Sequence, residues 1–249
     1  MKRCLIAFII GFVWNSAFAQ EGDEETQKLF SNESELSVSV ASGNAESESY
    51  LLRQLTEYEK GKSKATFNAL YQQIQGLDPV TEVFAESARR WELGFRFERE
   101  VMKNFAPYIN HIVFSDVLAS LVQRNSYGLG AKYTFWKKKN GKVSGEAGAQ
   151  SVFENRLVSQ NVNYLSSRAR VDGEYKIAKN TTAKLWVEYI LNVDNTDDYE
   201  VNFEPSIIVK INSLFSMKVS YQSRYDNVPA SADAENLDTL FATSLIAKF

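Results

Sequence analysis

The sequence predicts an all-β protein, an antiparallel transmembrane β-barrel of about twelve strands with both termini in the periplasm. Three observations support this fold class. Apolar and polar residues alternate over many strand-length segments, turn-forming residues separate these segments, and the connections alternate between short turns and longer polar loops. This combination is typical of bacterial outer-membrane barrels.

The alternation is clearest in residues 164–177, YLSSRARVDGEYKI. One set of alternate positions is mainly apolar, and the other carries Arg168, Arg170, Asp172, Glu174 and Lys176. A period of two is the period of a β-strand, whereas an α-helix would spread these charges around its circumference. The segment therefore predicts a strand with one apolar and one charged face.

The same criterion applied to the whole chain gives about twelve strands. The predicted spans are 35–42, 49–59, 63–75, 81–99, 104–114, 125–136, 142–154, 162–177, 181–192, 198–211, 215–225 and 237–249. An even number of strands returns both termini to the same side of a membrane. Pro107 and Pro205 fall inside predicted strands, and because proline donates no ladder hydrogen bond, each should lie at a bulge or a strand end. The stretch SDVLASLVQRN is expected to be a long loop, although it is unusually apolar for one.

The amino terminus predicts export. Lys2 and Arg3 precede an apolar run of about ten residues, shorter than a membrane-spanning helix, and a small-residue site ends at Ala19. Residues 1–19 are therefore expected to be a cleaved signal peptide, residues 20–34 a flexible polar lead-in, and residues 35–249 one barrel domain. Cleavage also removes Cys4, the only cysteine.

Several features favour a membrane barrel over a soluble one. Aromatic residues gather near predicted strand ends, as in the girdles of membrane barrels, and about twelve strands would make a soluble barrel too wide to fill. The apolar last strand ends at Phe249, which suits recognition by barrel-assembly machinery. The expected location is the outer membrane of a Gram-negative bacterium, and the expected partners are outer-membrane lipid, periplasmic chaperones and that machinery. A formal net charge of −3, or −5 without Lys2 and Arg3, argues against nucleic acid as a partner.

No residues predict an active site, a metal site or a cofactor site. His111 is the only histidine, and Ser115 would lie about 13 Å away along a strand. A lipid-cleaving barrel would need a distant serine beside His111. The acidic loop NVDNTDDYE does not have the ligand spacing of an EF-hand and is expected to be a solvated outer loop.

The charged row of 164–177 is expected to face the barrel interior, because an Arg or Lys on the lipid face costs about 2–4 kcal/mol at mid-membrane. Neighbouring strands should add charges to the same interior. The predicted lumen-facing residues are Arg168, Arg170, Asp172, Glu174, Lys176, Lys184, Glu188, Glu200 and Glu204. Their mixed signs are compatible with salt bridges that plug the barrel or with a narrow aqueous pore.

Three segments resemble a domain-of-unknown-function family of YdiY-like proteins described as salt-induced and outer-membrane. They are VSVASGNAESESYLLRQLTEYEKGK, YGLGAKY with Gly128 and Gly130, and the final YDNVPASADAENLDTLFATSLIAKF. The resemblance covers about residues 35–249 and implies an outer-membrane barrel without an established activity. Two hypotheses follow: a passive channel or envelope-structural barrel linked to osmotic conditions, and a barrel enzyme acting on lipid.

We expect the exported protein to begin at Gln20, because 17–19 is the small-residue site that follows the apolar run. Amino-terminal sequencing of protein isolated from the cell envelope checks this. Finding Met1 at the amino terminus would contradict export by cleavage.

Overall fold

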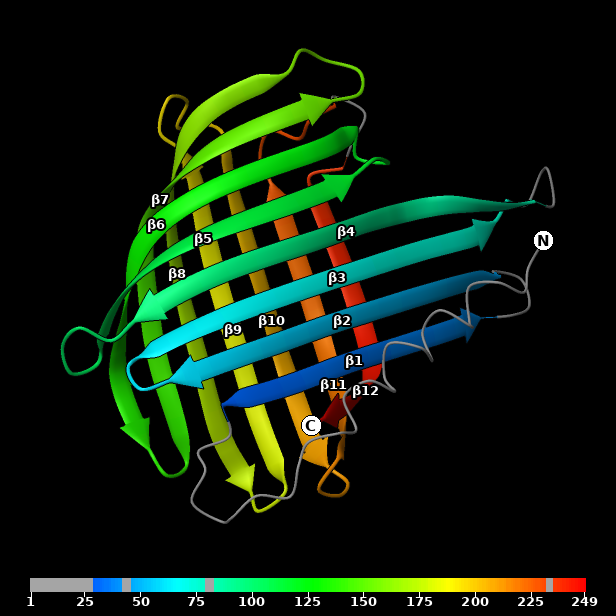
Figure 1. Ribbon diagram of the computed structural model, residues 1–249. Coiled ribbons are helices and arrows are strands. Elements are labelled where there is room, and N and C mark those ends of the chain that lie inside the picture. Colours follow the sequence, from blue (N-terminus) through cyan, green and yellow to red (C-terminus); the bar gives the residue numbers. More distant parts are fainter. Residues whose placement is uncertain (1–28, 42–45, 79–82, 232–234) are drawn as a thin grey trace.

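The computed structural model describes residues 29–41, 46–78, 83–231 and 235–249 (Figure 1). Its twelve strands are β1 (Phe30–Ala41), β2 (Ser47–Lys60), β3 (Ser63–Leu77), β4 (Phe84–Arg99), β5 (Phe105–Asp116), β6 (Leu121–Lys138), β7 (Gly141–Arg156), β8 (Val162–Ala178), β9 (Thr181–Asn192), β10 (Tyr199–Lys210), β11 (Phe215–Asp226) and β12 (Leu237–Lys248). The predicted fold class is confirmed. The predicted signal peptide lies outside the described residues.

The strands form one closed antiparallel sheet in which each strand pairs with its neighbours in sequence and β1 pairs with β12. Figure 1 shows β1–β4 crossing steeply over β9–β12 on the opposite wall. The connections after the even-numbered strands, such as 61–62, 139–140 and 179–180, are short and define the turn end. The connections after the odd-numbered strands, up to 227–236, define the loop end. Since β1 begins and β12 ends at the turn end, the barrel starts and finishes on one side.

Alternation gives the wall two different faces. The outward face exposes large apolar side chains, including Phe95, Leu129, Val171, Ile207 and Phe241. The buried residues inside are mostly polar or charged. A soluble barrel would show the reverse arrangement, with its apolar row inside. The outward apolar band is therefore the surface suited to lipid. Among the described residues, no helix is long and apolar enough to cross a membrane.

Two predicted boundaries are wrong. β1 begins at Phe30 rather than at residue 35, because residues 30–34 continue the register with β2 and Phe30 packs on Tyr58 with ring centroids 4.9 Å apart. The expected long loop SDVLASLVQRN is a short turn at 117–120, and β6 begins at Leu121. The turn is closed by Ser120, whose φ of 64° lies in the left-handed region. Leu121 is buried and Val122 is exposed, so the alternation of β6 already runs through them.

The two prolines lie inside strands, where one side of the ladder is missing. Pro107 pairs with β6, but the β4 ladder ends at Tyr108, so the absent N–H faces no partner. Pro205 keeps its register with β9 and interrupts the ladder to β11 at 204–205, with the same register resuming on both sides. Pro107 thus lies near a strand end, as expected. Pro205 needs neither a bulge nor a strand end, because the ladder to β11 is interrupted without a shift in register.

The seam between β1 and β12 is the shortest pairing in the barrel. Only residues 33–36 pair with 245–248, whereas every other pair of neighbouring strands aligns at least nine residues. In Figure 1 the final part of β12 lies beside the first part of β1, and the strands diverge from there. Backbone bonds between Asn32 and Phe249 extend the seam at the turn end. Closure therefore rests on few backbone pairs.

We expect the folded barrel to resist unheated sodium dodecyl sulfate and to migrate differently after boiling. A closed sheet satisfies most backbone hydrogen bonds internally, so detergent gains little by opening it. Gel mobility of membrane-extracted protein with and without heating checks this. Identical mobility would argue against the closed barrel.

We expect a Phe249→Ser variant to reach the membrane in much lower amount while its assembled fraction keeps normal heat resistance. The bonds between Asn32 and Phe249 use backbone atoms that serine retains, so the change removes only the aromatic ring. Quantifying folded protein in membranes checks the first part, and heating the assembled fraction checks the second. Normal membrane levels would contradict a role of the ring in assembly.

Candidate functional site: the charged lumen

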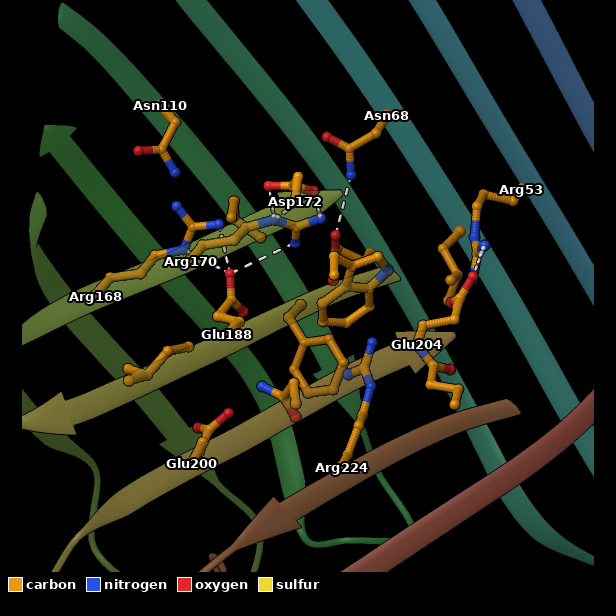
Figure 2. Close-up of a pocket in the computed structure, with 18 of the residues that line it drawn as sticks. Arg53, Asn68, Asn110, Arg168, Arg170, Asp172, Glu188, Glu200, Glu204 and Arg224 are labelled. Carbon is orange, nitrogen blue, oxygen red and sulfur yellow. Dashed lines mark hydrogen bonds and ion pairs between the residues drawn. The ribbon is translucent and has the colours of Figure 1, made fainter. Parts of the chain in front are cut away.

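The barrel encloses a cavity of about 770 Å³ that is lined by residues from all twelve strands. Lys64 and Lys142 line it near the turn end, while Asp116 and Asn236 line it near the loop end. Figure 2 shows charged side chains from β2, β8, β9, β10 and β11 projecting into this space. The site is therefore a lumen that runs along the barrel axis, and its walls carry charge.

A ring of four charged residues, here called the seam ring, lies beside the short β1–β12 pairing. Arg53 on β2 contacts Glu35 on β1 and Glu204 on β10, each at 3.2 Å. Lys218 on β11 contacts the same two carboxylates at 3.1 and 2.7 Å. The Lys218–Glu35 contact passes over β12 and joins its two neighbours. The seam ring therefore supplements the few backbone pairs that close the barrel.

A second network of ion pairs runs along the inner face of the wall from β4 to β9. Arg96 on β4 contacts Glu146 on β7 at 2.8 Å, and Glu146 contacts Arg168 on β8 at 3.1 Å. Arg168 continues to Glu188 on β9 at 2.5 Å. Figure 2 shows Arg168, Arg170 and Glu188 pointing toward one another. The network alternates in sign, so each buried charge lies beside an opposite one.

Tyr108 on β5 anchors this network. The guanidinium of Arg96 lies 3.8 Å from its ring centroid, and Arg168 donates to its hydroxyl at 3.3 Å. The side chain lies over two glycines. A Cβ at Gly130 would come within 2.6 Å of the Tyr108 hydroxyl, and one at Gly148 within 2.9 Å. These glycines leave the space that lets Tyr108 reach across β6 and β7 to Arg168.

A third network crosses the lumen toward the loop end. Arg124 on β6 contacts Glu154 on β7 at 2.7 Å and Glu200 on β10 at 2.5 Å. Arg156 and Tyr164 also hydrogen-bond to Glu154. β6 and β10 are separated by β7, β8 and β9, so Arg124 and Glu200 meet inside the cavity rather than along the wall. This contact narrows the lumen.

The structure brings most of the predicted interior residues onto the cavity wall. The lining residues among them are Arg168, Arg170, Asp172, Glu174, Lys184, Glu188, Glu200 and Glu204. Lys176 is exposed near the end of β8 and does not line the cavity. The structure divides the lining set among three networks and one looser pair, Glu174 with Lys184 at 3.4 Å.

Sequence analysis missed several central residues: Glu35, Arg53, Arg90, Tyr108, Arg124, Glu146 and Glu154. The charged residues among them could have been found by the same alternation of apolar and polar positions that identified residues 164–177 as a strand. Their contacts join strands that are distant in sequence, such as Arg53 with Glu204. No pattern within one strand predicts those pairs.

His111 lies on the outer side of the wall. It is aligned with Phe95 and Tyr127, both exposed, and paired residues share a face of the sheet. Its ring stacks on Tyr127 at 4.3 Å, and Nε2 lies 3.3 Å from the Asn125 amide oxygen. His111 therefore packs at the surface with an aromatic ring and an amide. Within the described ranges, no group of three or more His, Cys, Asp or Glu side chains is arranged to hold a metal ion.

The sequence profile of a family described as "Protein of unknown function, DUF481" matches residues 34–249. The chain belongs to this family. The YdiY-like resemblance is consistent with that membership. A search of curated proteins found no match to this sequence.

Solved structures of membrane barrels share the fold. An outer membrane channel from Pseudomonas putida F1 superposes with a TM-score of 0.51 and 12% sequence identity. The alignment covers 92% of this chain and 99% of the channel's chain. The NanC porin has a TM-score of 0.49 and 8% identity, covering 88% and 97%. A KdgM porin has a TM-score of 0.43 and 9% identity, covering 88% and 96%. The match to the Pseudomonas putida channel shows that this member of the DUF481 family shares the barrel fold of a solved outer membrane channel.

We expect Glu35→Gln to destabilise the barrel far more than Glu174→Gln. Glu35 is buried between Arg53 and Lys218, and breaking such a buried pair costs about 3–5 kcal/mol. Glu174 forms an exposed pair with Lys184, which is worth about 0–1 kcal/mol. The temperature at which the detergent-resistant band disappears measures both. Equal shifts for the two variants would contradict a role of the seam ring in closure.

Proposed function

We propose that this barrel is a narrow, passive channel for small hydrophilic solutes across the outer membrane of a Gram-negative bacterium, with both termini in the periplasm. The turn end then faces the periplasm and the loop end faces outward, as the short and long connections suggest. The apolar outward face contacts membrane lipid.

One observation carries the proposal: the charged cavity extends from residues near the turn end to residues of the loop end. Glu57, Lys64 and Lys142 line one end, and Pro229 and Glu235 line the other. Charged and amide side chains along this path can solvate water and ions. A barrel of about twelve strands also lies between side-chain-filled barrels of about eight and open porins of sixteen or more.

The contacts that cross the lumen make the proposed path narrow. Arg124 meets Glu200 inside the cavity, and Arg90 on β4 donates to Gln222 on β11 at 3.0 Å. We therefore expect a small conductance that depends on salt, since ions screen these pairs. The same contacts favour a second candidate function, an envelope-structural barrel in which the networks act as a plug. Its link to osmotic or salt conditions is implied only by the family resemblance.

We expect purified protein in planar bilayers to give small current steps, and the double variant Arg168→Gln with Arg170→Gln to shift ion preference toward cations. Both arginines line the cavity, and their removal leaves Glu146, Glu188 and Asp172 without these partners. Charge close to a narrow path sets ion preference. The reversal potential under a salt gradient measures the shift.

Lys176→Gln is the matched control, because it removes a positive charge from the same strand without touching the cavity wall. Both proteins must first pass the heated-gel test for folding. Silent bilayers with folded wild-type protein would favour the structural function. An unchanged preference in the double variant would mean that Arg168 and Arg170 do not line the conducting path.

A further inference from the structure

Two arginines near the loop end differ from the other arginines of the lumen. Arg53, Arg96, Arg124, Arg168 and Arg170 all line the cavity, and each contacts at least one carboxylate. Arg90 and Arg224 line the same cavity, yet across the part of the chain that the structure describes neither forms a salt bridge. Arg90 is only 6% exposed. A buried cation, Arg90, and a half-buried one, Arg224, are thus left without a salt bridge among the described residues.

One donor atom of each arginine has no protein acceptor. The Nε atoms of Arg90 and Arg224 are both buried and lack a hydrogen-bond partner among the described residues. An unsatisfied donor on a buried charged group costs more than the usual 1–3 kcal/mol of a neutral one. Such a group is stable in a structure when an unseen water or ion satisfies it, or when it awaits a ligand.

The two guanidinium groups are brought to one place by Gln222. Arg90 reaches across the lumen from β4 and donates to Gln222, which precedes Arg224 by two residues on β11. Positions two apart on a strand share a face and lie about 7 Å apart. Figure 2 shows Arg224 extending from β11 into the interior. One small ligand could therefore contact both guanidinium groups.

Nearby carboxylates lie close enough to act on the pair through space, but none forms a salt bridge with it among the described residues. Asp116 is aligned with Arg90 and Asp238 with Arg224 on adjacent strands, so both aspartates lie within reach. Asp116 instead accepts a hydrogen bond from the backbone of Ala119 in its own turn, and Asp238 is exposed to solvent. The guanidinium carbon of Arg224 lies 5.8 Å from the ring centroid of Phe114 on β5, which also lines the cavity.

We propose that Arg90 and Arg224, with Gln222 between them, form a binding site for the oxyanion group of a small solute, a carboxylate or a phosphate. Guanidinium groups present paired N–H donors that match such groups in geometry and charge. Phe114 supplies an apolar contact for the body of the solute. The site lies on the loop side of the cavity, where an entering solute arrives first.

The binding site rests on the proposed function only in that solutes must be able to enter the lumen. It is therefore tested by measuring ligand binding rather than ion current. Isothermal titration calorimetry on detergent-folded protein, at constant ionic strength, uses succinate, inorganic phosphate and neutral succinamide as probes. We expect heat of binding for at least one of the two anions and none for succinamide. Comparing succinate with phosphate identifies which oxyanion the site prefers.

The double variant Arg90→Gln with Arg224→Gln should lose roughly tenfold or more in affinity, because one charge-assisted hydrogen bond contributes about that much. Lys176→Gln should bind as the wild type does. If the double variant does not fold, Asp116→Asn provides a second test: removing a competing negative charge beside Arg90 should tighten binding.

Binding of neither anion, or unchanged affinity in both the double variant and Asp116→Asn, would overturn the site. If the protein binds an anion but gives no current in bilayers, the binding site is supported and the channel is contradicted. If it conducts but binds neither anion, the channel is supported and the binding site is contradicted.

Discussion

Compensation of buried charge inside a closed wall is the constraint on which this structure depends. Alternation turns about every second side chain of a strand into the lumen. Charged side chains are found there because a charge on the outer, lipid-suited face would be costly. The networks around Arg53, Arg168 and Arg124 meet this constraint by pairing opposite signs. In doing so they connect strands that share no backbone hydrogen bonds, such as β2 with β10 and β6 with β10.

At the seam between β1 and β12, side-chain ion pairs supplement a short run of backbone pairing. β1 and β12 share few register pairs, and the divergence beyond Leu36 leaves the loop-end part of β1 paired only with β2. The seam ring spans β12 from Lys218 to Glu35, and Lys248 pairs with Glu33 at 2.6 Å across the same junction. Ion pairs on the lumen side of the wall thus help to hold the sheet closed.

The same contacts decide what kind of interior the barrel has. Tyr108 and the arginines project across the wall and fill much of the space that a ring of twelve strands encloses. What is left is a cavity lined by these charged networks together with apolar side chains such as Phe114, Trp186 and Ile190. Arg90 and Arg224 differ from Arg168 and Arg170 because they form no salt bridge and each has an Nε atom without an acceptor among the described residues.

Sequence patterns predicted the strands well because alternation is a local property. Residues 164–177 and 181–192 correspond closely to β8 and β9. The errors fell where a local signal was ambiguous. Leu121 and Val122 belonged to a strand although their surroundings resembled a loop, and only the closing turn at Ser120 decides the matter. Pro205 was tolerated without a bulge because its neighbours on β9 keep the register.

By itself the sequence determined the number of strands, the two faces of the wall and which charges of 164–177 belong to one face, because each follows from side-chain period and turn chemistry. Only the tertiary structure decided which charges meet. Arg53 and Glu204 are separated by most of the chain, and their contact depends on barrel closure, strand tilt and the register of every strand between them. Closure likewise decided that Gly130 and Gly148 make room for Tyr108, because that space exists only where β5, β6 and β7 lie side by side.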